Sequence, residues 1–247
     1  MTQRKIHPAW IAAIVTFFTL IATAGFRAAP SVLIVPLHHA FGWSRASISA
    51  AISVNVLVYG LTAPFAAALM EKFGIRRVVM SALAIVGTGA WCTQYINRPW
   101  HLLILWGFIV GGGTGSMALV FAASIANRWF IKNKGLVVGI LTASSAAGNL
   151  IFLPGLSHLV VRFGWKSVSI TVALGALLMV PVIFLFLKES PLHAAVKPYG
   201  APDDYEFPER VHRNAGREAI ETLRSASRVP NFWFLCSSFF VCGLSTS

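Results

Sequence analysis

Residues Ala67-Ala68-Leu69-Met70-Glu71-Lys72-Phe73-Gly74-Ile75-Arg76-Arg77 form a short charged corner between two long apolar runs. Charged side chains are costly in the hydrocarbon of a bilayer, whereas they suit a turn at its surface. A glycine in such a corner favours a tight turn, because it has no Cβ to restrict the backbone. The stretch therefore predicts a loop that joins two membrane-spanning helices.

The rest of the chain repeats this alternation of apolar runs and short polar corners. Of the 247 residues, 56% are hydrophobic and only 11% are charged, whereas about 25% are charged in an average soluble domain. A membrane span needs ~20 consecutive apolar residues. Six segments reach that length: Trp10–Leu37, Ile48–Met70, Val78–Ile96, Leu102–Ile125, Gly135–Leu159 and Val168–Leu187. The sequence thus predicts an all-α polytopic membrane protein.

The distribution of Lys and Arg predicts the orientation. With the N-terminus placed inside, the inner segments hold fifteen basic residues and the outer segments hold four. Basic residues favour the cytoplasmic side of a membrane. We therefore expect a multi-pass protein of the inner (plasma) membrane with a cytoplasmic N-terminus and the lipid bilayer as its surroundings.

The formal net charge of +12 does not indicate a nucleic-acid partner, because the basic residues recur between apolar runs and form no single patch. The first apolar run, preceded by Arg4 and Lys5, could also be read as a signal peptide. It continues through Val35, however, which is too long for the apolar part of an ordinary signal peptide.

Composition divides the chain into four parts. Residues 1–9 are a short cytoplasmic N-terminus, and residues 10–187 carry the six spans. Residues 188–230 are polar and hold seven of the eight acidic residues, which predicts a cytoplasmic loop. Residues 231–247 are apolar again but too short for a full span. We expect them to be the start of a seventh helix, so that the chain is truncated there.

Small residues recur at four-residue spacing within the spans. Helices approach one another closely along such stripes in a membrane. The stripes predict a tightly packed bundle, and the triplet Gly111–Gly113 predicts a local bend. The stripes contain Gly60, Pro64 and Ala68; Gly107, Gly111 and Gly115; Gly135, Gly139, Ala143 and Ala147; and Ser144 with Gly148.

Polar side chains inside the spans are the candidates for substrate binding. Arg27 lies well inside the first span, and a buried arginine either contacts a substrate anion or caps helix carbonyls and snorkels to the surface. Asn55 and Tyr59 lie one turn apart on the second span, and Asn149 lies on the fifth. The amides either line the pathway or form hydrogen bonds between helices.

The absence of acidic residues from the interior of the spans favours an anionic cargo. Glu71, at the end of the second span, is the only acidic residue before Glu189. The sequence has no nucleotide-binding or metalloprotease motif, and its histidines do not follow the spacing of metal ligands. It therefore predicts no enzyme activity, no cofactor and no metal site.

The corner at Ala67–Arg77 resembles the loop motif between helices two and three of the major facilitator superfamily. Glu71 takes the acidic position and Lys72 the basic one, Gly74 supplies the turn, and Arg76 and Arg77 follow. The resemblance implies a six-helix N-terminal bundle built as a 3+3 repeat. It also implies that this cluster, with Arg128 as the partner of Glu71, latches the two halves of the transporter in its outward-facing state.

Two further stretches resemble the monocarboxylate-transporter and oxalate/formate-antiporter branch of the superfamily. They are Phe41–Arg45, leading into the second span, and Arg128–Gly148. The resemblance implies transport of a small organic anion, often with a proton, by alternating access. It also implies a second six-helix half that this chain lacks. The alternatives are a half-transporter, or a non-transporting membrane receptor or scaffold, that assembles with another chain.

Overall fold

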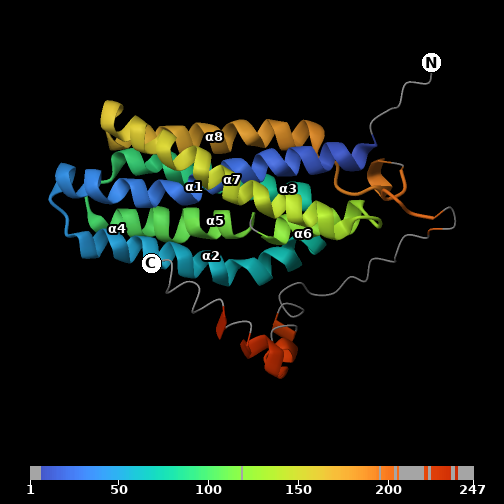
Figure 1. Cartoon of the computed structure of the whole chain (residues 1–247). Coiled ribbons are helices and arrows are strands. Elements are labelled where there is room, and N and C mark those ends of the chain that lie inside the picture. The colour runs from blue at the N-terminus through green and yellow to red at the C-terminus, as the bar shows by residue number, and fades with distance from the viewer. Residues whose placement is uncertain are drawn as a thin grey trace, which may run out of the picture.

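The computed structural model describes residues 7–117, 119–194, 196–202, 205, 220–221, 224–234 and 237–238. Six of its helical stretches are long and apolar enough to span a membrane. They run side by side as one elongated bundle (Figure 1). The spans are α1 (Pro8–Phe41), α2 (Arg45–Phe73), α3 (Ile75–Cys92) with the 3₁₀ turn η1 (Thr93–Tyr95), the composite helix Pro99–Trp129, α7 (Lys134–Phe163) and α8 (Trp165–Phe186).

These bounds confirm the predicted all-α polytopic architecture. Each span is as long as its predicted apolar segment or longer, because helical structure continues into the polar residues that cap it. Ser44 is an example, since its side chain accepts a hydrogen bond from the Ser47 backbone at the start of α2. Most of residues 231–247 lies outside the described residues, so the structure bears little on the expected seventh helix.

The fourth span is irregular. It starts as α4 (Pro99–Leu102) and continues as the π-helix η2 (Leu103–Val110) and then as α5 (Gly111–Gly115). After a turn it resumes as α6 (Leu119–Trp129). The predicted bend at Gly111–Gly113 thus lies in a helix with a π-helical segment before it and an interruption after it. Such departures from regular helix are frequent at functional sites.

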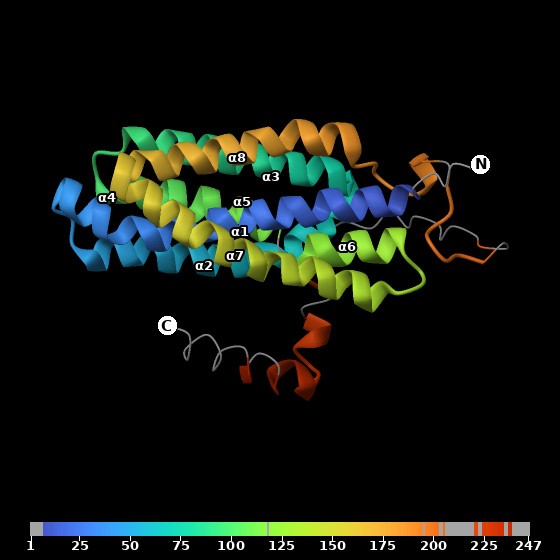
Figure 2. The ribbon, with the colours of Figure 1, turned by 45° about the horizontal axis from the view of Figure 1, so that its top comes forward.

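Helix α1 is the centre of the bundle and the most buried span. It packs along α7 and α8, while α3 packs along α8, and α2 packs along η2 and α5. Figure 2 shows α1 lying between α7 and α8 in a second view. Helices α2 and α7 are the least buried spans, and each carries large apolar side chains on an exposed face.

The glycine stripe of the fourth span packs against α2. Cβ atoms added at Gly107, Gly111 and Gly115 would meet α2 backbone atoms, such as the Asn55 carbonyl at 2.9 Å and the Tyr59 carbonyl at 2.6 Å. Each glycine therefore allows one turn of α2 to approach closely, as the spacing predicted. On α7, Gly148 does the same for α1, since its Cβ would lie 2.7 Å from the Ile21 carbonyl.

The glycines of two other predicted stripes face open space. Cβ atoms added at Gly60, Gly135 and Gly139 would meet nothing within 4 Å in the part of the chain that the structure describes. The prediction that these three glycines pack within this bundle was therefore wrong. They lie instead on α2 and α7, the two least buried spans.

The first part of the polar segment after α8 packs on the bundle. Tyr199 forms an isolated bridge with Phe130, and its N–H donates to the Trp129 carbonyl at 2.8 Å. Its ring lies 5.7 Å from the Trp10 ring and 5.6 Å from His7. The residues around Tyr199 are thus anchored to the ends of α1 and α6.

Candidate functional site

Arg27 is held against an aromatic ring in the transmembrane part of the bundle. Its guanidinium carbon lies 4.6 Å from the centroid of the Tyr59 ring, which comes from α2. A cation over the face of a tyrosine is attracted by the negative face of the ring. Arg27 is exposed on α1 although both of its sequence neighbours are buried. The charge therefore points out of the packed core and is oriented by Tyr59.

Asn55 forms a hydrogen bond between two spans. It is buried, and its amide donates to the carbonyl of Trp106 in the π-helix η2 at 2.5 Å. A π-helical turn shifts the backbone hydrogen-bond ladder, and the Trp106 carbonyl also accepts the Gly111 N–H. The sequence left two possibilities for this amide, a place in the pathway or a hydrogen bond between helices. The observed contact is a hydrogen bond between helices.

Asn149 is exposed on α7, next to the packed Gly148. Gly148 packs against Ile21, and Gly25 of α1 faces Phe152 of α7. These contacts place Asn149 at a level of the bundle close to Arg27. The structure thus brings Arg27 and Tyr59 together, leaves Asn149 exposed, and directs Asn55 to Trp106.

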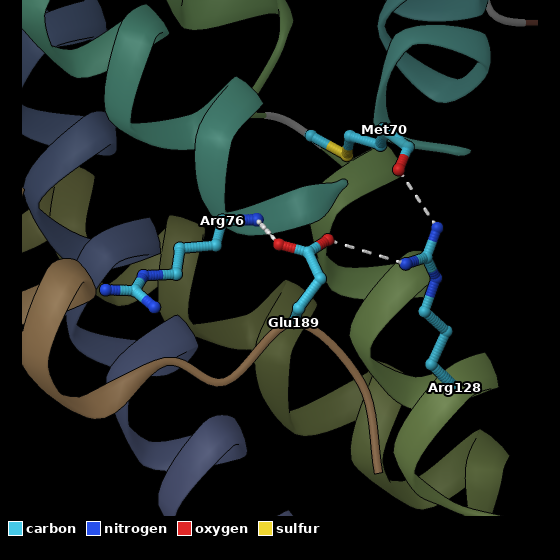
Figure 3. A network of polar contacts seen from close by, with 4 residues as sticks. All are labelled: Met70, Arg76, Arg128 and Glu189. Carbon is cyan, nitrogen blue, oxygen red and sulfur yellow. Dashed lines mark hydrogen bonds and ion pairs between the residues drawn. The ribbon is translucent and has the colours of Figure 1, made fainter. Parts of the chain in front are cut away.

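A second polar site lies at the end of the bundle where α2 turns into α3. Arg128, near the end of α6, donates from Nη2 to the Met70 carbonyl at 3.0 Å (Figure 3). Met70 lies in the last turn of α2, and its carbonyl also accepts the N–H of the C-cap residue Gly74 at 3.1 Å. A cation at this position is also favoured by the partial negative charge of the helix C-terminus. Arg128 therefore caps α2.

Glu189 caps the N-terminus of α3, although it lies 113 residues after Arg76 in the sequence. Its Oε2 accepts a hydrogen bond from the Arg76 backbone N–H at 3.3 Å, in the first turn of α3. The residue before α3, Gly74, has no side chain to cap it. Figure 3 shows the Glu189 carboxylate between Arg76 and Arg128. An anion at a helix N-terminus is favoured by the helix dipole.

The two caps are joined by an ion pair. Arg128 Nη1 lies 3.8 Å from Glu189 Oε1, and both side chains are mostly buried. We expected Glu71 to be the acidic partner of Arg128. The carboxylate that the structure places against Arg128 is that of Glu189, while Glu71 is exposed. The sequence does contain a clue to Glu189. It is the first acidic residue after Glu71, and it lies shortly after the end of α8.

The remaining residues of the corner divide into one that is fixed and two that are exposed. Arg76 donates to the Phe184 carbonyl in the last turn of α8, and its guanidinium carbon lies 4.3 Å from the Phe184 ring. Lys72 and Arg77 are exposed, and Lys72 Nζ lies 5.1 Å from the Phe73 ring. The corner thus connects α2, α3, α6 and α8 through charged contacts.

These features define a class of protein: a multi-pass membrane protein whose spans form one bundle, with an exposed arginine at mid-span and a charged network at the turn between its second and third spans. Among the described residues, no group of three or more His, Cys, Asp or Glu side chains could hold a metal ion.

The sequence matches the model of a known protein family. The Major Facilitator Superfamily matches this chain over residues 13–247. The chain therefore belongs to the major facilitator superfamily.

Individual relatives are distant. Human monocarboxylate transporter 7 is 28% identical over 157 residues, which cover 64% of this chain and 30% of that protein. The uncharacterized MFS-type transporter YcxA of Bacillus subtilis (strain 168) is 23% identical over 183 residues, covering 74% of this chain and 45% of its own. The uncharacterized MFS-type transporter YhjX of Escherichia coli (strain K12) is 26% identical over 210 residues, which cover 83% of this chain and 45% of that protein. The chain thus spans less than half the length of these relatives.

Proposed function

We propose that this six-span bundle is the N-terminal half of a secondary transporter that carries a small organic anion, of the monocarboxylate kind, by alternating access. The second half, on the same polypeptide or on another, completes the pathway. Family membership supports transport as the general activity. The anionic cargo rests on the chemistry of the bundle itself.

The observation that carries the proposal is the charge of the exposed transmembrane face. Arg27 is the only charged residue well inside a span, and the nearest acidic residues in the sequence, Glu71 and Glu189, lie at the end of the bundle. A guanidinium can bind a carboxylate through two parallel hydrogen bonds. One ring face of Tyr59 holds Arg27 in place, and the planar fork keeps further donors for a ligand.

The open faces of α2 and α7 support a second half as the partner. These two spans are the least buried, and their unpacked glycines would let another helix approach closely. In transporters built from related halves, the substrate binds between the halves near the middle of the membrane. Arg27, Tyr59 and Asn149 would then line one wall of that site.

The corner between α2 and α3 supports a role in gating. We propose that Glu71, Lys72, Gly74, Arg76, Arg77 and Arg128 hold the second half in one state of the cycle. In that arrangement Glu189 fixes the corner from within the bundle, while the exposed Glu71, Lys72 and Arg77 are available to the opposite half. The distribution of basic residues supports placing this end of the bundle in the cytoplasm.

Uptake into proteoliposomes tests the proposal. The complete transporter that carries this bundle is reconstituted and offered labelled lactate, pyruvate or oxalate, with a quaternary ammonium cation as the matched control. We expect saturable uptake of at least one carboxylate and none of the cation. Uptake of the cation without any carboxylate would contradict the anionic cargo.

A further inference from the structure

A basic groove lies at the charged corner. Lys72, Arg76 and Arg77 supply its charge, and Phe73, Met80 and Phe184 supply its apolar walls. The groove thus runs between the end of α2, the start of α3 and the end of α8. It combines cations and exposed apolar surface within one depression.

The groove carries an excess of positive charge. Glu189 also lines it, but that carboxylate accepts the Arg76 N–H and pairs with Arg128, which lies outside the groove. Its charge is therefore already matched. Lys72 and Arg77 remain exposed, and Arg76 is fixed by the ring and the carbonyl of Phe184. A fixed guanidinium beside two exposed cations is suited to a phosphate group.

The apolar walls indicate that the ligand is an amphiphile. Phe73 and Phe184 are 50% and 54% exposed, and Phe184 continues into the exposed apolar face of α8, where Leu178 and Leu185 are 64% and 70% exposed. Since α8 is a candidate membrane span, this face meets the acyl chains. The groove therefore lies where the end of a span meets the headgroup layer.

We propose that this groove binds the headgroup of an anionic phospholipid, such as phosphatidylglycerol, with the phosphate on Lys72, Arg76 and Arg77 and the acyl chains along α3 and α8. Basic pockets between helix ends are suited to anionic headgroups. The site rests on the membrane location of the bundle and does not depend on the proposed cargo. Because Arg76 also fixes the ends of α3 and α8, bound lipid would stabilise the corner between α2 and α3.

Native mass spectrometry of the purified full chain tests the site. The chain is titrated in detergent with phosphatidylglycerol and with phosphatidylcholine of the same acyl chains. We compare K72Q/R77Q with R45Q/R98Q, which removes two exposed cations from the opposite end of the bundle. Each cation near a membrane surface contributes about fivefold in affinity for anionic lipid. We expect K72Q/R77Q to bind phosphatidylglycerol about 25-fold more weakly and R45Q/R98Q to bind it within about twofold of the unchanged chain.

Three outcomes would overturn the proposal. Phosphatidylcholine could bind as tightly as phosphatidylglycerol, or both double variants could lose affinity equally, which would indicate diffuse attraction. Free glycerol 3-phosphate could displace the lipid at equal concentration, which would indicate a site for a soluble anion. Circular dichroism checks that the variants keep their helix content, and thermal unfolding with and without lipid gives a second readout: lipid should raise the unfolding temperature of the chain but not that of K72Q/R77Q.

Discussion

The carboxylate of Glu189 occupies the space that a side chain on Gly74 would need. A Cβ added at Gly74 would lie 2.1 Å from Glu189 Oε1, and the Gly74 φ of +96° is one that other residues rarely adopt. The glycine of the corner thus does two things: it makes the turn from α2 to α3, and it leaves room for a distant carboxylate to cap α3. The corner is therefore completed by a residue that follows the sixth span.

Loss of the Glu189 carboxylate should destabilise the bundle. In E189A the Arg76 N–H loses its acceptor and Arg128 loses its ion-pair partner. We expect the free energy of unfolding to fall by about 1–3 kcal/mol, measured by denaturant titration in detergent. E189Q should recover part of the loss, because its amide oxygen can still accept the Arg76 N–H. E71A is the control, since Glu71 is exposed; equal losses in E71A and E189A would contradict the account.

Substitution of Gly74 should be more damaging than substitution of a glycine with similar backbone strain. Gly164 also has a positive φ, of +78°, but a Cβ added there meets nothing within 4 Å. G164A should therefore show only the backbone cost of about 1–3 kcal/mol, whereas G74A adds the clash with Glu189. Thermal unfolding of both variants measures the difference. The double variant G74A/E189A should lose less than the sum of its parts, and additive losses would show that the two residues do not interact.

The packed glycines of the fourth span should be intolerant of a methyl group. G115A would place its Cβ 2.6 Å from the Tyr59 carbonyl, whereas G139A meets open space on α7. We expect G115A to lower the unfolding temperature and the helix-favouring G139A to leave it unchanged or raise it. Similar behaviour of the two variants would contradict the observed contact between α5 and α2.

Tyr59 should act through Arg27. Y59F keeps the ring face that lies 4.6 Å from the guanidinium carbon, whereas Y59L removes it. A cation–π contact contributes about 0.5–2 kcal/mol, so we expect Y59L to raise the KM for the carboxylate roughly 3- to 30-fold while Y59F changes it less. Uptake kinetics in proteoliposomes separate the two. A large effect of Y59F would assign the role to the hydroxyl group instead.

Much of the fold could be predicted because its signals are local. The length of each apolar run predicts a span, and the spacing of Gly107, Gly111 and Gly115 predicts a packed stripe, which the structure confirms. The partners of the polar groups could not be predicted in the same way. Glu189 reaches α3 from 113 residues further along the chain, and Asn55 of α2 donates to the Trp106 carbonyl of the fourth span. Both contacts depend on how the helices pack, which periodicity does not encode.

The most direct test of the central claim is carboxylate uptake by Arg27 variants of the complete transporter. R27A and R27K are compared with R45A, which removes an exposed arginine at the end of α2 away from the charged corner, with all variants matched for protein in the membrane. We expect R27A to abolish carboxylate uptake and R45A to transport normally. R27K should retain a fraction of the uptake with a raised KM, because a point charge cannot replace the planar fork. Unchanged uptake by R27A would contradict the role of Arg27 as the anion contact.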